Sequence, residues 1–113
     1  NLGQYVKALE LYQQALVIHR EIGDRSGESN SLNNIGSIYN SLGQYSRALE
    51  FYQRALGIAK EIRNRKGEGT TLNNIGVIYT NLGQYVKALE LYQQALVIHR
   101  EIGDRKVESN TLN

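Results

Sequence analysis

The sequence contains no cysteine, proline or methionine, and no apolar run in it is long enough to cross a membrane. Without cysteine, the chain has neither a disulfide framework nor a thiolate metal site. Without proline, the helix ends must rest on glycine and on short polar residues. A membrane-spanning helix needs about 20 apolar residues, and no signal peptide is visible. We therefore expect a cytoplasmic protein, and the missing initiator methionine indicates a piece of a longer natural protein or a designed fragment.

An excess of charge of one sign is also missing. The 13 lysines and arginines stand against 11 aspartates and glutamates, which gives a net charge of +2 with the signs interspersed. This balance argues against nucleic acid and against a membrane as partners. No serine–histidine–acid set or carboxylate pair recurs, so we expect no enzyme activity. His19 and His99 lie two repeats apart, too far to share a metal ion, and no metal or other cofactor is expected.

What the sequence does contain is an internal repeat of 40 residues. Residues 41–80 match residues 1–40 at more than half of their positions, and residues 81–105 match residues 1–25 without a change. Such a period predicts a stack of repeated units rather than a globule with one closed core. The whole chain is then one array, residues 1–113, with the units 1–40, 41–80 and, in part, 81–113.

Each unit predicts two helices. Apolar and small side chains recur at the i, i+3, i+4, i+7 spacing of a helix with one buried face. We name the two resulting sets the B helices (Tyr5–Ile22, Tyr45–Ile62 and Tyr85–Ile102) and the A helices (Arg25–Ser41 and Arg65–Asn81). All 8 tyrosines occupy only three positions of the repeat, which is expected of residues that pack against neighbouring units.

Short polar residues and glycines are predicted to mark the helix ends. A short side-chain oxygen can accept a hydrogen bond from a first-turn amide, and a glycine can take the left-handed conformation that closes a helix. The predicted N-caps are Asp24 and Asn64 for the two full A helices and Asp104 for a third A helix, of which the sequence contains only the first part. The glycines predicted to close an A helix are Gly3, Gly43 and Gly83.

The buried face of the first A helix is predicted to contain a glycine. Its members are Leu32, Ile35, Gly36, Tyr39 and Leu42. Glycine inside a helix is unfavourable by about 1 kcal/mol relative to alanine, so its presence indicates a close approach of two helices. We expect Gly36 to lie against the small Ala48 of the facing B helix, and a bulkier residue there to be overpacked.

A signature of small, apolar and aromatic residues also recurs from unit to unit. It comprises Asn33-Asn34-Ile35-Gly36, Tyr39, Leu42-Gly43, Tyr45, Ala48, Tyr52 and Ala55. These residues resemble the tetratricopeptide repeat, with Leu32 in place of the usual tryptophan and Lys60 in place of the closing proline. The repeat is longer than the common one of about 34 residues, as in LGN/Pins-type polarity adaptors and many bacterial multi-repeat proteins. The resemblance implies an all-α, right-handed solenoid of antiparallel helix pairs, with five full helices and a stub.

The resemblance also implies a ligand site, because the A helices line the concave face of such arrays. The A-helix residues not used for packing are Asn30, Asn33, Asn34, Ser37 and Asn40 and, one unit later, Thr70, Asn73, Asn74, Val77 and Thr80. Related arrays grip peptide main chains with an asparagine ladder, and an amide offers both a donor and an acceptor. In the alternative, one asparagine of each pair bonds to a neighbouring helix and the other is only solvated. The basic residues with which one subclass holds a C-terminal carboxylate are missing.

We therefore predict a non-catalytic scaffold that binds an extended or helical segment of a protein partner on its concave face. The alternative is a structural module that associates with copies of itself, because the array has two unlike apolar ends without polar caps. A single-stranded RNA reader of the helical-repeat type is disfavoured by the neutral groove. The basic residues Arg63, Arg65 and Lys66 are interpreted as a solvated loop, since Glu61 and Glu68 flank them.

Overall fold

Five α-helices make up almost the whole chain in the computed structural model, which describes the backbone of residues 1–112 and the side chains of residues 1–105. They are α1 (Leu2–Glu21), α2 (Arg25–Ser41), α3 (Tyr45–Glu61), α4 (Arg65–Asn81) and α5 (Tyr85–Leu112). The predicted all-α class is confirmed, and α2 and α4 have the bounds expected of the A helices. Within the described residues, no helix combines the length and the apolar character needed to cross a membrane.

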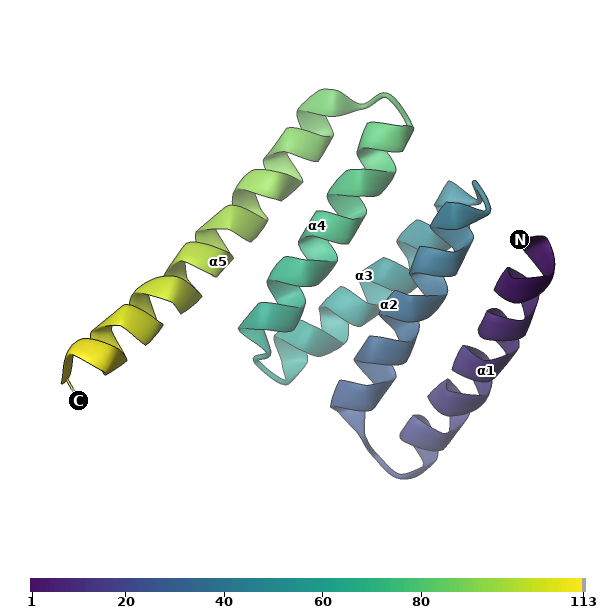
Figure 1. Cartoon of the computed structure of the whole chain (residues 1–113), viewed down its shortest axis with the longest axis horizontal. Coiled ribbons are helices and arrows are strands. Elements are labelled where there is room, and N and C mark those ends of the chain that lie inside the picture. Colours follow the sequence, from purple (N-terminus) through teal and green to yellow (C-terminus); the bar gives the residue numbers. More distant parts are fainter. Residues whose placement is uncertain (113) are drawn as a thin grey trace.

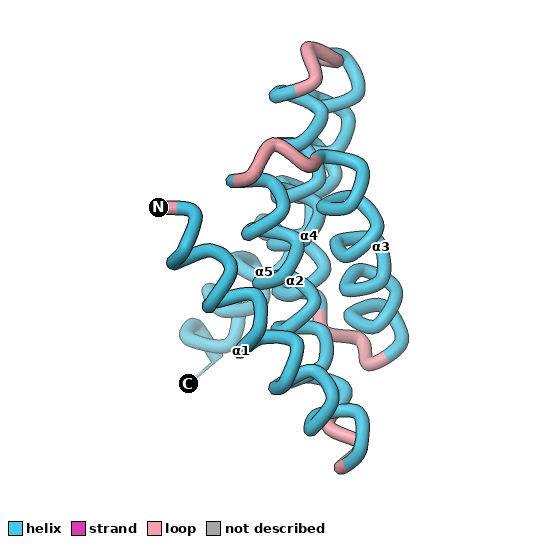
Figure 2. Tube along the Cα trace, turned by 90° about the vertical axis from the view of Figure 1, so that its right-hand side faces the viewer, coloured by secondary structure: helices cyan, strands magenta, loops and turns pink. Residues whose placement is uncertain are grey.

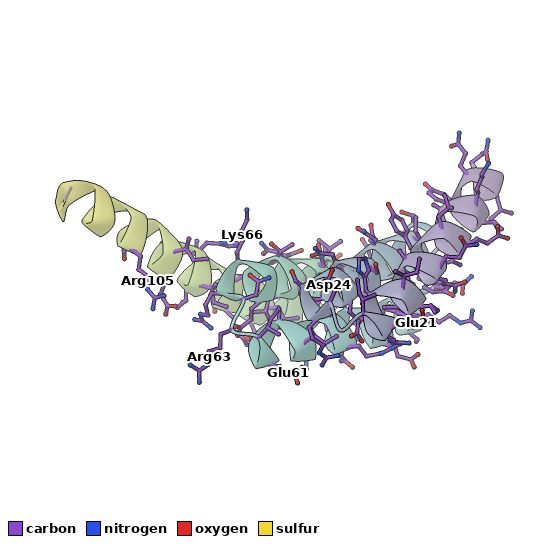
Figure 3. All side chains as sticks on the ribbon, turned by 90° about the horizontal axis from the view of Figure 1, so that it is seen from below. Glu21, Asp24, Glu61, Arg63, Lys66 and Arg105 are labelled. Atoms are coloured by element: carbon purple, nitrogen blue, oxygen red, sulfur yellow. The ribbon has the colours of Figure 1, made fainter. Side chains whose placement is uncertain are left out.

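The helices form a short stack in which neighbours run antiparallel (Figure 1). The stack is bowed: α3 lies on one side, α1 and the two termini lie on the other, and α2 and α4 lie between them (Figure 2). Seen along the edge of the stack, α1 and the end of α5 both rise toward the same side (Figure 3). The A helices α2 and α4 therefore face the hollow side of the molecule, and the B helix α3 covers the outer side.

The core runs along the stack between the two layers of helices. Leu32 and Ile35 of α2 are fully buried, and they pack in one cluster with Ala48 and Tyr52 of α3 and with Ile78 of α4. A Cβ atom added to Gly36 would lie only 2.7 Å from the ring of Tyr52. The predicted close approach of the A and B helices is confirmed, but the nearest neighbour of the glycine is this tyrosine ring and not Ala48.

Most of the predicted helix ends are confirmed. The Asp24 carboxylate accepts a hydrogen bond from the Gly27 amide at 2.9 Å, and the Asn64 amide oxygen accepts one from the Gly67 amide at 3.0 Å. Gly43 and Gly83 follow α2 and α4 with φ of 74° and 77°, in the left-handed region. These residues close one helix and start the next within three-residue turns.

Two predicted ends are wrong. Gly3 does not close a helix but lies inside α1, which begins at Leu2 with Asn1 as its N-cap. Asp104 is not an N-cap, because α5 continues through it without a turn, and the predicted stub is the end of α5. At Gly3 there is no preceding helix in the chain to close. After Asp104 only nine residues remain, too few to gain much from a separate helix, so the backbone keeps its intrahelical hydrogen bonds. The last of them, Asn113, lies outside the described residues.

Candidate peptide-binding surface

The predicted site residues occupy the polar face of α2 and α4, but the structure divides them into two groups. One group already bonds to other side chains of the array, and the other does not. The first group consists of Asn33, Asn40, Asn73 and Thr80, and Ser37 lies near the Tyr52 hydroxyl. The second consists of Asn30, Asn34, Thr70, Asn74 and Val77, none of which forms a side-chain hydrogen bond with another described residue.

Asn33 links the two A helices. Its amide nitrogen donates to the Thr71 hydroxyl of α4 at 3.0 Å, and that hydroxyl lies 3.2 Å from the Asn33 amide oxygen, to which it can donate in return. Thr71 is fully buried, so this side chain depends on Asn33 for its hydrogen bond. In the next unit, Asn73 has a weaker contact, with its amide nitrogen 3.5 Å from Nε2 of His99. The observed contact of Asn33 is therefore the one that the alternative predicts, a hydrogen bond to a neighbouring helix.

The end of the polar face near the A/B turns is also internally bonded. The Asn81 amide donates to the Asn40 amide oxygen at 3.0 Å, which joins the ends of α2 and α4. In the second unit, Thr80 approaches the Tyr92 hydroxyl at 3.2 Å. Burial raises the pKa of Tyr52 above its ordinary value, and the nearby Ser37 hydroxyl offsets part of that rise.

The remaining asparagines form no hydrogen bond with another described side chain. Asn34 is exposed and Asn74 is half-buried, and they occupy equivalent positions one repeat apart. About one helical turn earlier on the same two helices, a hollow of about 270 Å³ opens between α2 and α4. It is lined by Asn30, Asn33, Asn64, Lys66, Gly67 and Thr70. This surface can offer amide and hydroxyl groups to the main chain of an extended peptide, and Lys66 is the one charged group in the lining.

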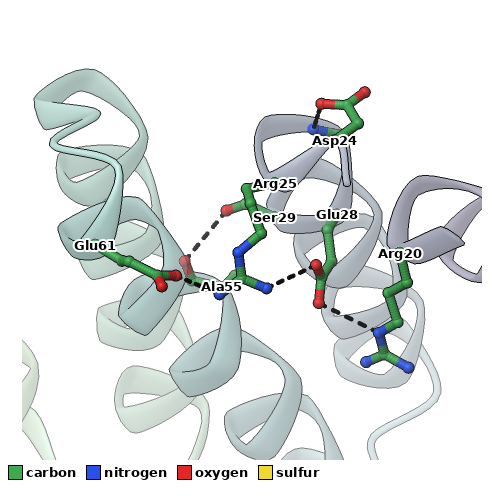
Figure 4. Close-up of polar contacts among 8 residues, drawn as sticks. Arg20, Asp24, Arg25, Glu28, Ser29, Ala55 and Glu61 are labelled. Carbon is green, nitrogen blue, oxygen red and sulfur yellow. Dashed lines mark hydrogen bonds and ion pairs between the residues drawn. The ribbon is translucent and has the colours of Figure 1, made fainter. Parts of the chain in front are cut away.

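Ion pairs link the helices at each B/A junction, the segment where a B helix ends and the next A helix begins (Figure 4). They were not predicted from the sequence. Glu28 is buried and accepts hydrogen bonds from Arg20 at 3.2 Å and from Arg25 at 2.8 Å. Burial alone would raise the pKa of Glu28, but the two arginines outweigh it, so the pKa lies below its ordinary value. Arg25 also binds Glu61 at the end of α3.

The same arrangement recurs one unit later. Arg65 donates to Glu68 at 2.9 Å and to Glu101 of α5 at 2.6 Å. In each unit an arginine at the start of the A helix therefore binds a glutamate at the same repeat position of the B helix that packs beside it, Glu61 of α3 and Glu101 of α5. The signal that could have revealed this was the recurrence, at the repeat spacing, of an arginine with one glutamate three residues later and another 36 residues later.

Comparison with known proteins agrees with this architecture. Two tetratricopeptide repeat models match the chain, one at residues 1–61 and one at residues 70–101. A comparison with curated protein sequences found no significant match.

Solved structures with the same arrangement of helices include three of known origin. BtubC (BKLC) from P. vanneervenii is 27% identical with a TM-score of 0.78, over 88% of this chain and 41% of that one. Aspartyl phosphate phosphatase F from Bacillus subtilis is 26% identical with a TM-score of 0.82, over 91% and 27%. The TPR domain of Arabidopsis FLU is 23% identical with a TM-score of 0.78, over 86% and 82%, and supports the fold alone. The chain thus spans less than half the length of two of these structures.

Proposed function

Because this chain belongs to the tetratricopeptide repeat family, whose repeats generally mediate protein–protein interactions, we propose that its A-helix face binds an extended segment of a protein partner. Asn34 and Asn74 contact the main chain of that segment. The observation that carries the proposal is that these two equivalent amides have no hydrogen bond to another described side chain. Asn33 has a different role, since its bond to Thr71 holds α2 and α4 at the spacing that the two ligand-binding amides require.

The affinity of this surface alone is modest. A hydrogen bond in water contributes about 0.5–1.5 kcal/mol net. Two asparagines with a donor and an acceptor each would therefore contribute about 4 kcal/mol, which is no more than the lower end of the cost of association, about 4–15 kcal/mol. Side-chain contacts in the hollow beside Asn30 and Thr70 would add to this value and would supply selectivity.

A random peptide library displayed on phage, selected on the immobilised chain, provides ligands for the test. The Kd of each selected peptide is then measured by fluorescence anisotropy. We expect Asn34→Ala/Asn74→Ala to weaken binding by about tenfold or more, because up to four hydrogen bonds are lost. The matched control is Gln53→Ala/Gln93→Ala, which truncates exposed amides of the B helices. Equal losses in the two variants would refute the proposal.

Self-association remains the second candidate function, and one observation favours it. Residues 1–25 and 81–105 are identical, yet their apolar faces are exposed in opposite ways. Ile18 of α1 is 54% exposed where its equivalent Ile98 is 5% exposed, and Leu96 of α5 is 47% exposed where its equivalent Leu16 is 6% exposed. The two ends of the stack therefore offer complementary apolar faces, which a second copy could cover head to tail.

Sedimentation velocity over a wide concentration range tests this second function. Such assembly predicts particles larger than dimers for the parent chain, and monomers for Ile18→Glu and for Leu96→Glu, each of which blocks one end. A mixture of the two variants should form dimers only, because each still carries one intact end and the two ends differ. A parent chain that stays monomeric throughout would refute self-association and leave the peptide-binding function untouched.

A further inference from the structure

The two B/A junctions of the array differ in charge although they have the same fold. The first junction, residues 20–28, carries two cations and three anions and has a net charge of −1. The second junction, residues 60–68, carries four cations and two anions and has a net charge of +2. Glu21 and Asp24 thus mark an acidic end of the junction edge, and Arg63, Lys66 and Arg105 mark a basic end (Figure 3).

A hollow of about 570 Å³ lies at the basic end, and we call it the basic hollow. It is lined by Lys60, Arg63, Arg65, Glu68 and Arg105. Glu68 and Glu101 both form ion pairs with Arg65. The charge of Arg65 is therefore neutralised by contacts within the array. Lys60 and Arg63 form no ion pair with another described side chain. At the first junction the residue equivalent to Lys60 is Arg20, which binds Glu28 at 3.2 Å.

Arg63 occupies a backbone position that suits glycine. Its φ is 58°, in the left-handed region, and it is the one non-glycine residue with positive φ among those described. The equivalent residue of the first junction is Gly23, with φ of 72°. An arginine is less favourable there than the glycine that closes the first junction. The Arg63 side chain points away from the body of the molecule on its outer side (Figure 3).

We propose that the basic hollow binds an acidic segment of a protein partner, with Lys60, Arg63 and Arg105 contacting its carboxylates. The planar guanidinium groups of two arginines match carboxylates in a two-pronged geometry. A nucleic acid fits less well, because the lining contains no aromatic side chain on which a base could stack. The site is separate from Asn34 and Asn74, so it does not depend on the peptide-binding function of the A helices.

Capped hexaglutamate is the probe for this proposal, and its binding is followed by shifts of backbone amide signals in NMR spectra. We expect shifts at residues 60–68 and at Arg105, and an affinity that falls by about tenfold between about 20 and 200 mM salt. Arg63→Gly should weaken binding about threefold, and Lys60→Gln/Arg63→Gly about tenfold. Asn34→Ala/Asn74→Ala should leave hexaglutamate binding unchanged, which keeps the two proposed sites distinguishable.

The same variant carries its own control for folding. Arg63→Gly relieves the strained backbone, so its melting temperature should rise by about 4 °C while binding weakens. Lys7→Gln, on the exposed face of α1, removes the same charge elsewhere and should leave the affinity unchanged. An equal loss in Lys7→Gln would mean diffuse attraction and would overturn the proposal. So would tighter binding of a short oligothymidylate than of hexaglutamate, or no binding of hexaglutamate at about 20 mM salt.

Discussion

Replacement by alanine is expected to have opposite effects on stability at two glycines that lie inside helices. Gly36 lies in α2, where an added Cβ would sit 2.7 and 2.8 Å from two carbons of the Tyr52 ring. Gly57 lies in α3, where an added Cβ would meet nothing within 4 Å. Replacing either glycine with alanine removes a helix penalty of about 1 kcal/mol. Only at Gly36 does the new methyl group collide with a neighbour.

The size of that collision sets the expected difference. Tyr52 is only 3% exposed, so its ring cannot move into solvent, and overpacking in such a core costs about 1–3 kcal/mol. Set against the gain of about 1 kcal/mol in helix propensity, Gly36→Ala should lower the free energy of unfolding by about 1 kcal/mol. Gly57→Ala should raise it by about the same amount. The two variants should then differ by about 8 °C in melting temperature.

Urea unfolding followed by circular dichroism at 222 nm measures both variants. A double-mutant cycle of Gly36→Ala with Tyr52→Leu tests the cause, because a smaller side chain should remove most of the penalty. Gly76→Ala offers a graded check: its Cβ would lie 2.6 Å from Tyr92, but that ring is only half-buried and can yield, so the loss should be smaller. If Gly36→Ala stabilised the chain as much as Gly57→Ala does, the close packing of α2 on α3 would be refuted.

Three further predictions follow from the polar contacts. Glu28 has a lowered pKa in the folded state, so its contribution to stability is present at neutral pH and is lost as the pH falls through that pKa. Glu28→Gln should remove this part of the acid dependence of the unfolding free energy, measured in urea titrations at several pH values. Tyr52 has a raised pKa, so its own contribution to stability should be constant below pH of about 10 and fall above it as the unfolded state ionises first. Tyr52→Phe should weaken that alkaline loss. Asn33→Ala should cost about 1–3 kcal/mol because it leaves the buried Thr71 hydroxyl unpaired, whereas Asn34→Ala should change the free energy of unfolding by less than about 0.5 kcal/mol.

The helices could be predicted because their signals are local and repeated. The spacing of apolar residues gives the buried face of each helix, and Asp24, Asn64 and Gly43 carry the chemistry of a helix end in a single residue. The candidate site could be predicted only as a face. Whether an asparagine is already hydrogen-bonded within the array depends on a residue of the next repeat, as the bond between Asn33 and Thr71 shows. No spacing within one helix contains that information.

The junction residues show a second limit of the same reasoning. The sequence predicts that Glu61 and Glu68 neutralise the basic residues beside them. In the structure Glu68 does bind one of them, Arg65. Glu61 instead binds Arg25 of the preceding unit, and Arg63 forms no ion pair with another described side chain. Charges that are adjacent in sequence need not be partners in space, because each helix turn directs successive side chains to different neighbours.

The identical segments 1–25 and 81–105 separate local from tertiary causes within one molecule. Leu2-Gly3-Gln4 is helical, but the same three residues at 82–84 form a turn with Gly83 in the left-handed conformation. Conversely, Gly23 makes a turn with φ of 72°, whereas the equivalent Gly103 lies inside α5. The turns at Gly83 and Gly23 each join two full-length helices, which pack against each other. At Gly3 and Gly103 one of the two helices is missing or short, and the backbone stays helical. The glycines therefore permit a turn in this array, and the burial of a neighbouring helix decides whether the chain makes it.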